Sequence, residues 1–386
     1  MRALINAKIY PMTGGVIERG TILIDEGKIL DVGAEIAVPA GANLVDCSGK
    51  VVIPGIIDAH THIGIGEEGI GWEGRDYNEM TDPLTPDLRA IDGINPEDQG
   101  FQDARAGGIT TVMTGPGSAN VLGGQNVVIK TYGRTIEGMI LRNPAGVKGA
   151  FGENPKRVYG QGKSQAPMTR MATAGLMRKI LVKAQNYKKK LEKGREDADK
   201  MPDRDLQMEI LVDVLEKRIP LRLHAHRADD IMTILRIARE FDINVTIEHC
   251  TEGHKIAEEI AAAGVPTVVG PSLTNRAKVE LNDRTFETPN ILYQAGVKIA
   301  LMTDHPVIPL QYLPVAAALC VKEGLPYEEA LKAITINSAE ILGVADRVGS
   351  LEKGKDADLV VYDGDPLAIQ SKIELVLING EPVYEK

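Results

Sequence analysis

Residues 51–62 read VVIPGIIDAHTH, an apolar run that is interrupted by Pro-Gly and ends in two histidines two positions apart. A short apolar run beside a turn signal predicts a buried strand, and side chains two apart on a strand point to the same side. His60 and His62 should therefore converge where the strand ends, and paired imidazoles suit zinc or a similar divalent ion. A lone His-x-His also occurs in polar turns, but its position at a strand end favours a metal site.

Seven further strand candidates follow this stretch, and amphipathic helical patterns lie between several of them. The eight candidates are Val51–Ile57, Ile109–Met113, Val127–Ile129, Val147–Phe151, Leu221–His224, Val245–Ile247, Thr267–Val269 and Ile299–Met302. Alternating strands and helices predict parallel strands joined by crossover helices. Eight such strands predict an α/β fold with a closed (β/α)8, TIM-like barrel.

Both ends of the chain have short strand patterns, and Asn379-Gly380 between two apolar runs is a strong hairpin signal. We therefore expect one small β domain built from residues 1–50 and 346–386, around a barrel formed by residues 51–345.

The composition argues against several classes of function. A formal net charge of −10 disfavours binding to nucleic acid or to a membrane surface. Three widely spaced cysteines form no disulfide framework, so a reducing compartment fits. No run approaches the roughly 18 apolar residues of a membrane span, and the first ten residues do not resemble a signal peptide. A cytoplasmic protein is the expectation.

Other strand candidates also end in residues that can bind metal. His224 and His226 close one strand, His249 follows the next, and Asp304 with His305 follows the last. A remaining histidine, His254, is interpreted as the start of a helix. Four strand ends that carry ligand-type residues are hard to attribute to chance.

The segments PGIIDAHTH, LHAH, IEHC and LMTD resemble the ends of strands 1, 5, 6 and 8 in the amidohydrolase superfamily. The tail AITINSAEILGVADRVGSLEKGKDADLVVYDGDP, residues 333–366, is similar to the segment that returns to the β domain in imidazolonepropionase-like members. The resemblance spans nearly the whole chain. It implies a distorted barrel, a β-sandwich made by both termini, and a metal-activated hydroxide that attacks an amide-like carbon.

The resemblance also implies roles for single residues. It makes His60 and His62 the first-strand ligands, and Asp304 the carboxylate that binds metal and shuttles the proton as general base and acid. It makes His249 the ligand of strand 6. His224 matches the ligand of strand 5, and His226 is the alternative candidate for that ligand. His226 or His305 could help the metal to polarise the carbonyl group.

The fourth-strand ligand is left between two residues. Family members use either a carboxylated lysine that bridges two metals or a glutamate at this strand. Lys148 lies inside an apolar strand, where a bare ammonium would be costly to bury, whereas Glu153 lies at the strand's end. We favour Lys148, and with it two ions, most simply zinc; an outward-pointing lysine is the alternative.

Substrate signals are weak. Four basic residues, Lys156, Arg157, Arg227 and Arg276, lie just past predicted strand ends and could bind a substrate carboxylate. The leading hypothesis is hydrolysis of a C–N bond in a small molecule, either a cyclic amide of the imidazolonepropionase type or a prolidase-like dipeptide.

Two alternatives remain open. A heterocycle deaminase of the family usually carries Glu three residues after the strand 5 histidine, where this chain has Arg227. A non-catalytic scaffold with the same fold usually loses metal ligands, which this chain keeps. Homo-oligomers are common in the family, although no sequence feature marks an interface.

Overall fold

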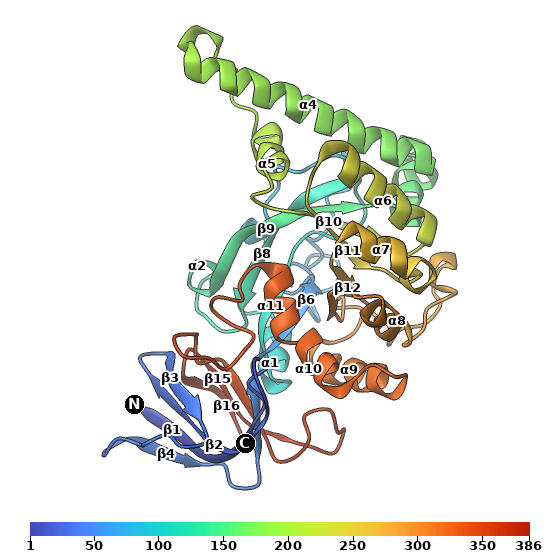
Figure 1. Cartoon of the computed structure of the whole chain (residues 1–386). Helices are drawn as coiled ribbons and strands as arrows, with labels where there is room; N and C mark the ends of the chain where they lie inside the picture. The colour runs from blue at the N-terminus through green and yellow to red at the C-terminus, as the bar shows by residue number, and fades with distance from the viewer.

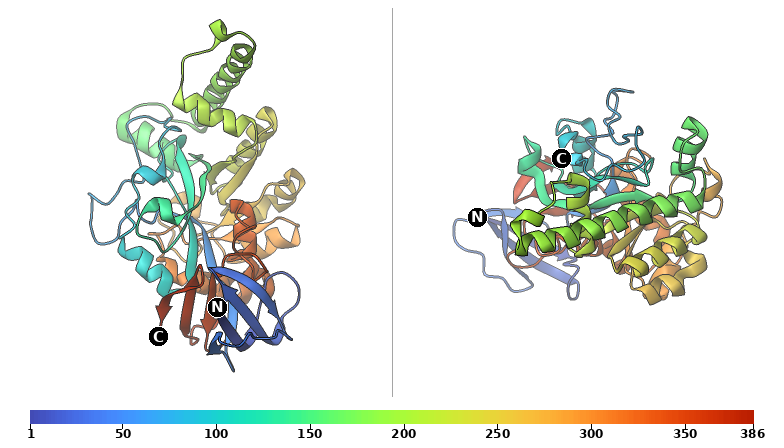
Figure 2. Two further views of the ribbon diagram at one scale, coloured as in Figure 1. Left: turned by 90° about the vertical axis from the view of Figure 1, so that its left-hand side faces the viewer. Right: turned by 90° about the horizontal axis from the view of Figure 1, so that it is seen from above.

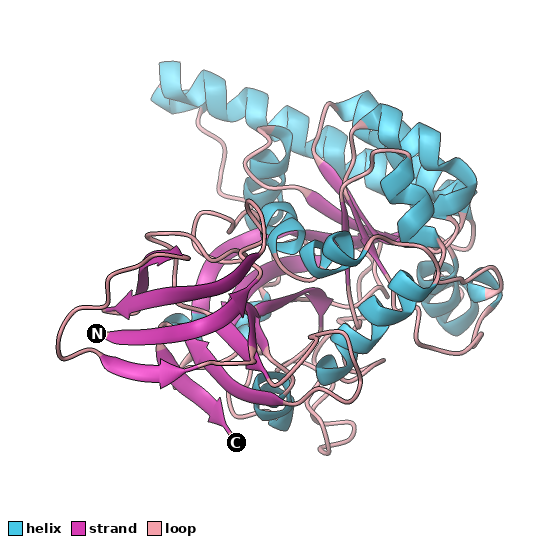
Figure 3. Cartoon of the chain, turned by 60° about the horizontal axis from the view of Figure 1, so that its bottom comes forward, coloured by secondary structure: helices cyan, strands magenta, loops and turns pink.

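A computed structural model describes residues 1–386, and its strands form two separate sheets (Figure 1). The strands of both chain ends, blue and red in Figure 1, lie together in one sheet. The other sheet lies among the helices, and the same division is visible in Figure 3. No helix combines the length and the apolarity that crossing a bilayer requires.

The terminal sheet has eight strands in the order β16-β15-β14-β5-β1-β2-β3, with β4 also paired to β1. Their bounds are β1 Arg2–Ile9, β2 Ile17–Asp25, β3 Lys28–Gly33, β4 Asn43–Asp46, β5 Val51–Pro54, β14 Leu359–Tyr362, β15 Ile373–Ile378 and β16 Glu381–Glu385. Asn379 and Gly380 both have positive φ in the turn between β15 and β16, as the hairpin signal predicted. The strands of both ends thus form one hydrogen-bonded sheet; its description as a sandwich stays a prediction.

The second sheet also has eight strands, in the order β13-β12-β11-β10-β9-β8-β7-β6. Their bounds are β6 Ile56–Thr61, β7 Ile109–Thr114, β8 Leu122–Lys130, β9 Ile140–Ala150, β10 Leu221–Ala225, β11 Val245–His249, β12 Thr267–Val269 and β13 Ile299–Leu301. This is the predicted barrel, distorted and nearly closed.

The prediction of uniformly parallel strands was wrong at β8. This strand is antiparallel to both β7 and β9, whereas the other neighbouring pairs are parallel. Residues 115–121 connect β7 to β8, and residues 131–139 connect β8 to β9. Both connections are shorter than the dozen or more residues that a parallel crossover needs, so the chain turns back on itself.

The barrel closes between its first and last strands through side chains and a single backbone bond. The backbone amide of Thr303 lies 3.1 Å from a carboxylate oxygen of Asp58, and the Thr303 hydroxyl donates to the same oxygen at 2.5 Å. The amide of His62 donates to the carbonyl of His305 at 2.8 Å. Burial raises the pKa of Asp58 to about 7.

The strand predicted over residues 51–57 divides into two at Gly55. The first part, β5, pairs with β1 and β14 in the terminal sheet, and the second part, β6, begins the barrel. A Cβ atom on Gly55 would lie 2.0 Å from the Thr110 hydroxyl oxygen, so only glycine fits at this crossing. The chain therefore passes from one sheet to the other within a single residue.

Helices cover the barrel on its outside. Their bounds are α1 Gln99–Ala106, α2 Ile136–Met139, α3 Glu153–Pro155, α4 Arg170–Glu196, α5 Leu206–Leu215, α6 Ala228–Phe241, α7 Ala257–Ala263, α8 Thr288–Gln294, α9 Leu313–Lys322, α10 Tyr327–Ala333 and α11 Ile336–Leu342. Helix α4 packs through one side, on which Ile180, Ala184 and Tyr187 are buried. The end of α4 extends beyond the barrel, together with the segment that leads to α5 (Figure 2).

Candidate metal centre

Three ligand-type side chains meet where the chain leaves the first and last barrel strands. The Nε2 atom of His60 lies 3.4 Å from an Asp304 carboxylate oxygen, and that of His62 lies 3.3 Å from the same oxygen. The three ligand atoms lie within 4.8 Å of one another. His-x-His at the end of β6 thus converges as its spacing predicted, and the carboxylate comes from the residue that sequence reasoning chose.

Hydrogen bonds from the surroundings fix the orientation of these rings. The Nδ1 atom of His60 lies 2.8 Å from the Glu248 carboxylate, and that of His62 lies 2.7 Å from the carbonyl oxygen of Gly115. Both partners are acceptors, so Nδ1 carries the proton and the Nε2 lone pair points toward Asp304. Histidines that bind metal are usually held by such a partner on the far nitrogen.

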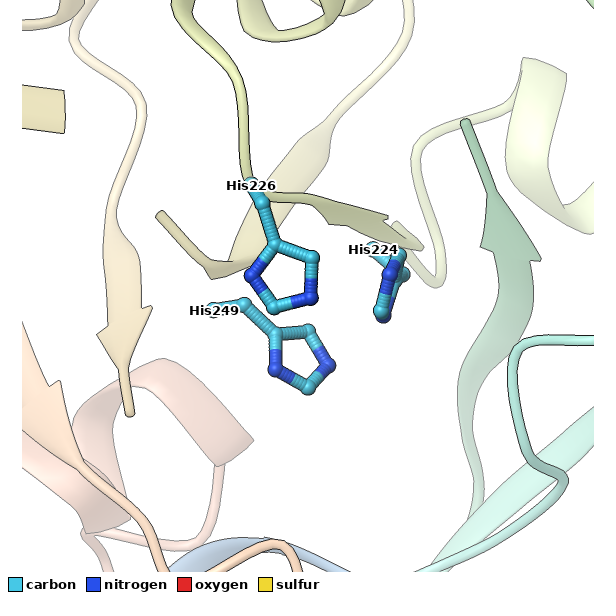
Figure 4. A group of neighbouring side chains, drawn as sticks. All are labelled: His224, His226 and His249. Carbon is cyan, nitrogen blue, oxygen red and sulfur yellow. The ribbon is translucent and has the colours of Figure 1, made fainter. Parts of the chain in front are cut away.

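A second group consists of His224, His226 and His249, which come from the ends of β10 and β11 (Figure 4). Their rings lie close together at steep angles, and the ring centroids of His224 and His249 are 4.1 Å apart. The Nδ1 atom of His249 lies 3.0 Å from the Gly270 carbonyl oxygen, so its Nε2 is also free to bind metal. The centroids of His60 and His249 are 5.2 Å apart, so the two groups are adjacent.

Two nitrogen atoms of these rings are buried without any hydrogen-bond partner in the protein. They are Nδ1 of His224 and Nε2 of His226. An unpaired buried polar atom is costly, and an ion or a polar group of a bound substrate would satisfy each of them. The other nitrogen of His226 is 2.7 Å from the Thr251 hydroxyl, and that of His224 is 3.4 Å from the Asn154 amide. The donor set therefore fits a divalent metal.

The backbone is strained at these positions. His249, Cys250 and Asp304 all have positive φ, at 73°, 51° and 56°. This conformation costs an L-residue roughly 1–2 kcal/mol, and such outliers gather at functional sites. At His249 the left-handed turn allows the side chains of both Glu248 and His249 to lie in the barrel interior.

The charge states of most of these groups match those of metal ligands, although the neighbouring carboxylates outweigh burial and raise the pKa of His60. Burial holds the pKa of His224 and His249 well below the usual value, and it lowers that of His226 to about 3. Burial alone would raise the pKa of Asp304, but His249, His60 and His62 outweigh it and hold that pKa well below its usual value. Neutral imidazoles beside an ionised carboxylate are the forms that bind metal.

Lys148 reaches the same place from β9. Its side chain is only 1% exposed, and its Nζ atom lies 3.0 Å from Nε2 of His60. Burial lowers the pKa of its ammonium group to about 8. Glu153, the competing choice, begins helix α3, and its backbone amide donates to Glu280 at 3.0 Å. The structure thus brings Lys148, and not Glu153, next to the first group of ligands.

His305 is buried beside the site without belonging to either group of ligands. Neither of its ring nitrogens has a hydrogen-bond partner, and Nε2 lies 3.6 Å from a Glu68 carboxylate oxygen. Burial lowers its pKa to about 4. His254 lies in a short 3-10 helix, Gly253–Ile256, that leads into α7, and it is 2.9 Å from the Thr288 hydroxyl.

Two of the four basic residues proposed to bind substrate have bonds to protein groups close by in the sequence. Arg227 forms an ion pair with Asp229 at 2.9 Å, and exposed Arg276 donates to the carbonyl of Asn282 at 2.8 Å. Lys156 and Arg157 lie in a π-helical turn, where Arg157 is exposed.

Sequence reasoning missed an ion pair that does lie beside the second group. The buried Glu280 carboxylate lies 3.7 Å from Nε2 of His226 and 2.9 Å from Nζ of Lys278. These residues belong to the irregular segment after β12, which carries no periodic signal. Glu248 was missed as well, although its position next to His249 at a strand end could have suggested it.

Glu248 connects the first group to the barrel interior. The Thr246 hydroxyl donates to it at 2.6 Å, and fully buried Arg222 approaches it to 3.4 Å. Burial would raise the pKa of Glu248, but its bond to His60 and the neighbouring positive charges bring it to about 2. Glu248 therefore stays ionised and holds the proton of His60 on Nδ1.

Comparison with known proteins shows similarity over most of the chain. The model of the amidohydrolase family matches residues 51–383. The amidohydrolase tasK of Hapsidospora irregularis is 30% identical over 95% of this chain, which spans 40% of that relative's length. An imidazolonepropionase of Rhizobium rhizogenes is 25% identical, with 100% of this chain and 96% of the relative covered.

Solved structures show the same fold. An amidohydrolase from Thermotoga maritima MSB8 is 49% identical, with a TM-score of 0.97 and 100% of both chains covered. A prolidase complexed with N-methylphosphonate-L-proline has a TM-score of 0.61 at 18% identity, again over 100% of both chains. The resemblance that the strand-end motifs suggested is confirmed, and this chain belongs to the amidohydrolase family.

Proposed function

We propose that the protein hydrolyses a C–N bond, in an amide or cyclic amide of a small substrate, with the help of divalent metal. One observation carries this proposal: two adjacent groups of ligand-type side chains at the carboxyl ends of the barrel strands. Active sites of such barrels lie at this end.

The side chains divide between two ions. His60, His62 and Asp304 would hold one ion, and His224 and His249 would hold the other. Lys148 would bridge them after its neutral Nζ adds to carbon dioxide and releases a proton, which leaves a carbamate. A pKa of about 8 makes the neutral amine accessible near neutral pH. One or two ions of zinc suit the imidazole-rich set.

Side chains of the protein then transfer the protons of the reaction. Bound divalent metal supplies the Lewis acidity that lowers the pKa of water from about 15.7 to about 7. Asp304, ionised between His60 and His62, accepts the proton of the attacking water and returns it to the leaving nitrogen. In this proposal His226 or His305 donates a hydrogen bond to the carbonyl oxygen of the substrate.

The names of similar proteins support this chemistry. An imidazolonepropionase and a protein called an amidohydrolase are among the relatives, and a prolidase shares the fold. These names favour a cyclic amide or a dipeptide as the substrate class. They also favour a carboxylate on the substrate, although Arg227 and Arg276 are engaged elsewhere.

The experiment is a measurement of metal per chain on protein purified without chelator. The wild type is compared with His60→Ala and Lys148→Ala, and His254→Ala serves as the matched control because that histidine lies outside both groups. We expect about two ions in the wild type and in the control, and a loss in both site variants.

Other outcomes would redirect the proposal. About one ion, unaffected by the loss of Lys148, would contradict the bridge and favour a mononuclear site with Glu153. No metal in any preparation would overturn the hydrolase and favour a non-catalytic scaffold. Conversion of a heterocyclic amine, with dipeptides and cyclic amides left untouched, would favour a deaminase.

A further inference from the structure

A cavity of about 630 Å³ lies at the end of the barrel opposite the histidines. Four of its lining residues each directly precede a barrel strand: Pro220 before β10, Asn244 before β11, Pro266 before β12 and Lys298 before β13. The candidate metal centre lies at the carboxyl ends of the same strands. The volume falls within the range of pockets that bind small molecules.

Positive charge dominates the polar part of the lining. Five basic side chains and one acidic side chain face the cavity: Arg142, Lys217, Arg218, Arg239, Lys298 and Glu340. Three of the five have carboxylate partners, since Lys217 pairs with Asp242, Arg218 with Asp213, and Lys298 with Glu340.

The other two cations have no carboxylate partner. Arg142 on β9 donates to the carbonyl oxygens of Leu342 and Arg218 at 2.9 and 3.2 Å, so its side chain is held in place while its charge is not offset. Arg239, near the end of α6, is exposed and forms no ion pair. Guanidinium groups in this state are the usual partners of phosphate and carboxylate groups.

The remaining wall is apolar. Leu235 and Ala238 of α6, with Ile243 and Val245, line the cavity beside the cations. This combination suits a ligand that has an apolar body and one anionic end. Water or a bare inorganic anion would leave the apolar surface without a partner.

We propose that this cavity binds a small organic anion, a phosphate monoester or a carboxylate with an apolar body, through Arg142 and Arg239. The site is separate from the reaction centre because it opens at the amino ends of the strands. A result against the proposed hydrolysis would therefore leave this binding proposal unaffected.

The test is calorimetric titration of the metal-loaded protein with phenyl phosphate and with phenylacetate, at constant ionic strength. The variants are Arg142→Met and Arg239→Met, and the matched control is Arg236→Met. Arg236 lies three residues earlier on α6 but does not line this cavity. His60→Ala is included because an anion could bind at the metal centre instead.

We expect saturable binding of at least one of the two ligands, weakened about tenfold or more in each cavity variant and unchanged in Arg236→Met and His60→Ala. Inorganic phosphate should bind more weakly than phenyl phosphate. Arg239→Met keeps the test valid if Arg142→Met does not fold, because Arg239 is on the surface. Binding that is lost in His60→Ala and kept in Arg239→Met, or no binding of either ligand, would overturn the proposal.

Discussion

The single residues of the candidate centre differ in how far sequence alone could place them. Histidines and a carboxylate at strand ends were recognisable, because the fold brings the carboxyl ends of the strands together. The role of Arg227 and Arg276 in binding substrate stays a prediction, because both also follow strands but bond to nearby protein groups. The direction of a side chain in an irregular loop depends on its neighbours in space, and no pattern in the chain records them.

Glu248 is the residue for which the structure makes the sharpest prediction. Glu248→Gln replaces an ionised acceptor by a neutral amide, so the bond that keeps the proton of His60 on Nδ1 becomes weaker. Changes of this kind typically lower metal affinity about 10–100-fold. Competition with a chelator of known affinity would measure the loss.

The control for Glu248 is Glu252→Gln, which changes a carboxylate that accepts a hydrogen bond from the amide of Ala228. It should leave metal affinity unchanged. Equal losses in the two variants would indicate a general effect of removing charge, and not the orientation of His60.

At the scale of elements, the sequence predicted which segments are strands better than it predicted how they pair. All eight barrel segments exist, because apolar runs of this kind must be buried. The reversed direction of β8 was missed, although its two short connections argue for it. The division at Gly55 was missed because β5 and β6 form one continuous apolar run.

The crossing at Gly55 yields a prediction about packing. Gly55→Ala places a methyl group 2.0 Å from the Thr110 hydroxyl oxygen and forces β6 and β7 apart. Overpacking of this kind costs about 1–3 kcal/mol, which chemical denaturation would measure as a lower free energy of unfolding.

Gly15→Ala is the matched control for Gly55, since no atom lies within 4 Å of a Cβ at Gly15. Its free energy of unfolding should equal or slightly exceed that of the wild type. A Gly55→Ala variant of wild-type stability would show that the strands can move apart at no cost.

At the scale of the whole molecule, buried ion pairs connect the barrel to the terminal sheet, in addition to the covalent chain. Lys130, at the end of β8 and 3% exposed, lies 2.7 Å from Asp356 and 3.0 Å from Asp358 of the returning segment. Charges buried in this way are tolerated only as a set. The sequence showed the two β-rich ends but gave no sign of this contact, whose partners lie more than 200 positions apart.

Removing Lys130 should destabilise the entire protein. Lys130→Met leaves the buried Asp358 carboxylate without its cation, whereas Asp356 keeps Lys28 and Arg347. The loss of one partner from a buried pair costs about 3–5 kcal/mol. Thermal unfolding should therefore begin at a clearly lower temperature. Lys189→Met, at an exposed position on α4, should unfold like the wild type. A barrel that kept its stability while the terminal sheet unfolded alone would contradict this view of the joint.

The crossing of the chain between the two sheets at Gly55 has a consequence for slow fluctuations. Strands β5 and β6 belong to different sheets, yet neither can open without pulling on the other. Their amide hydrogens should therefore exchange with solvent deuterium at similar, very low rates, and only when the entire chain unfolds. The two sheets should therefore open as one cooperative unit, although two separate sheets would suggest two such units.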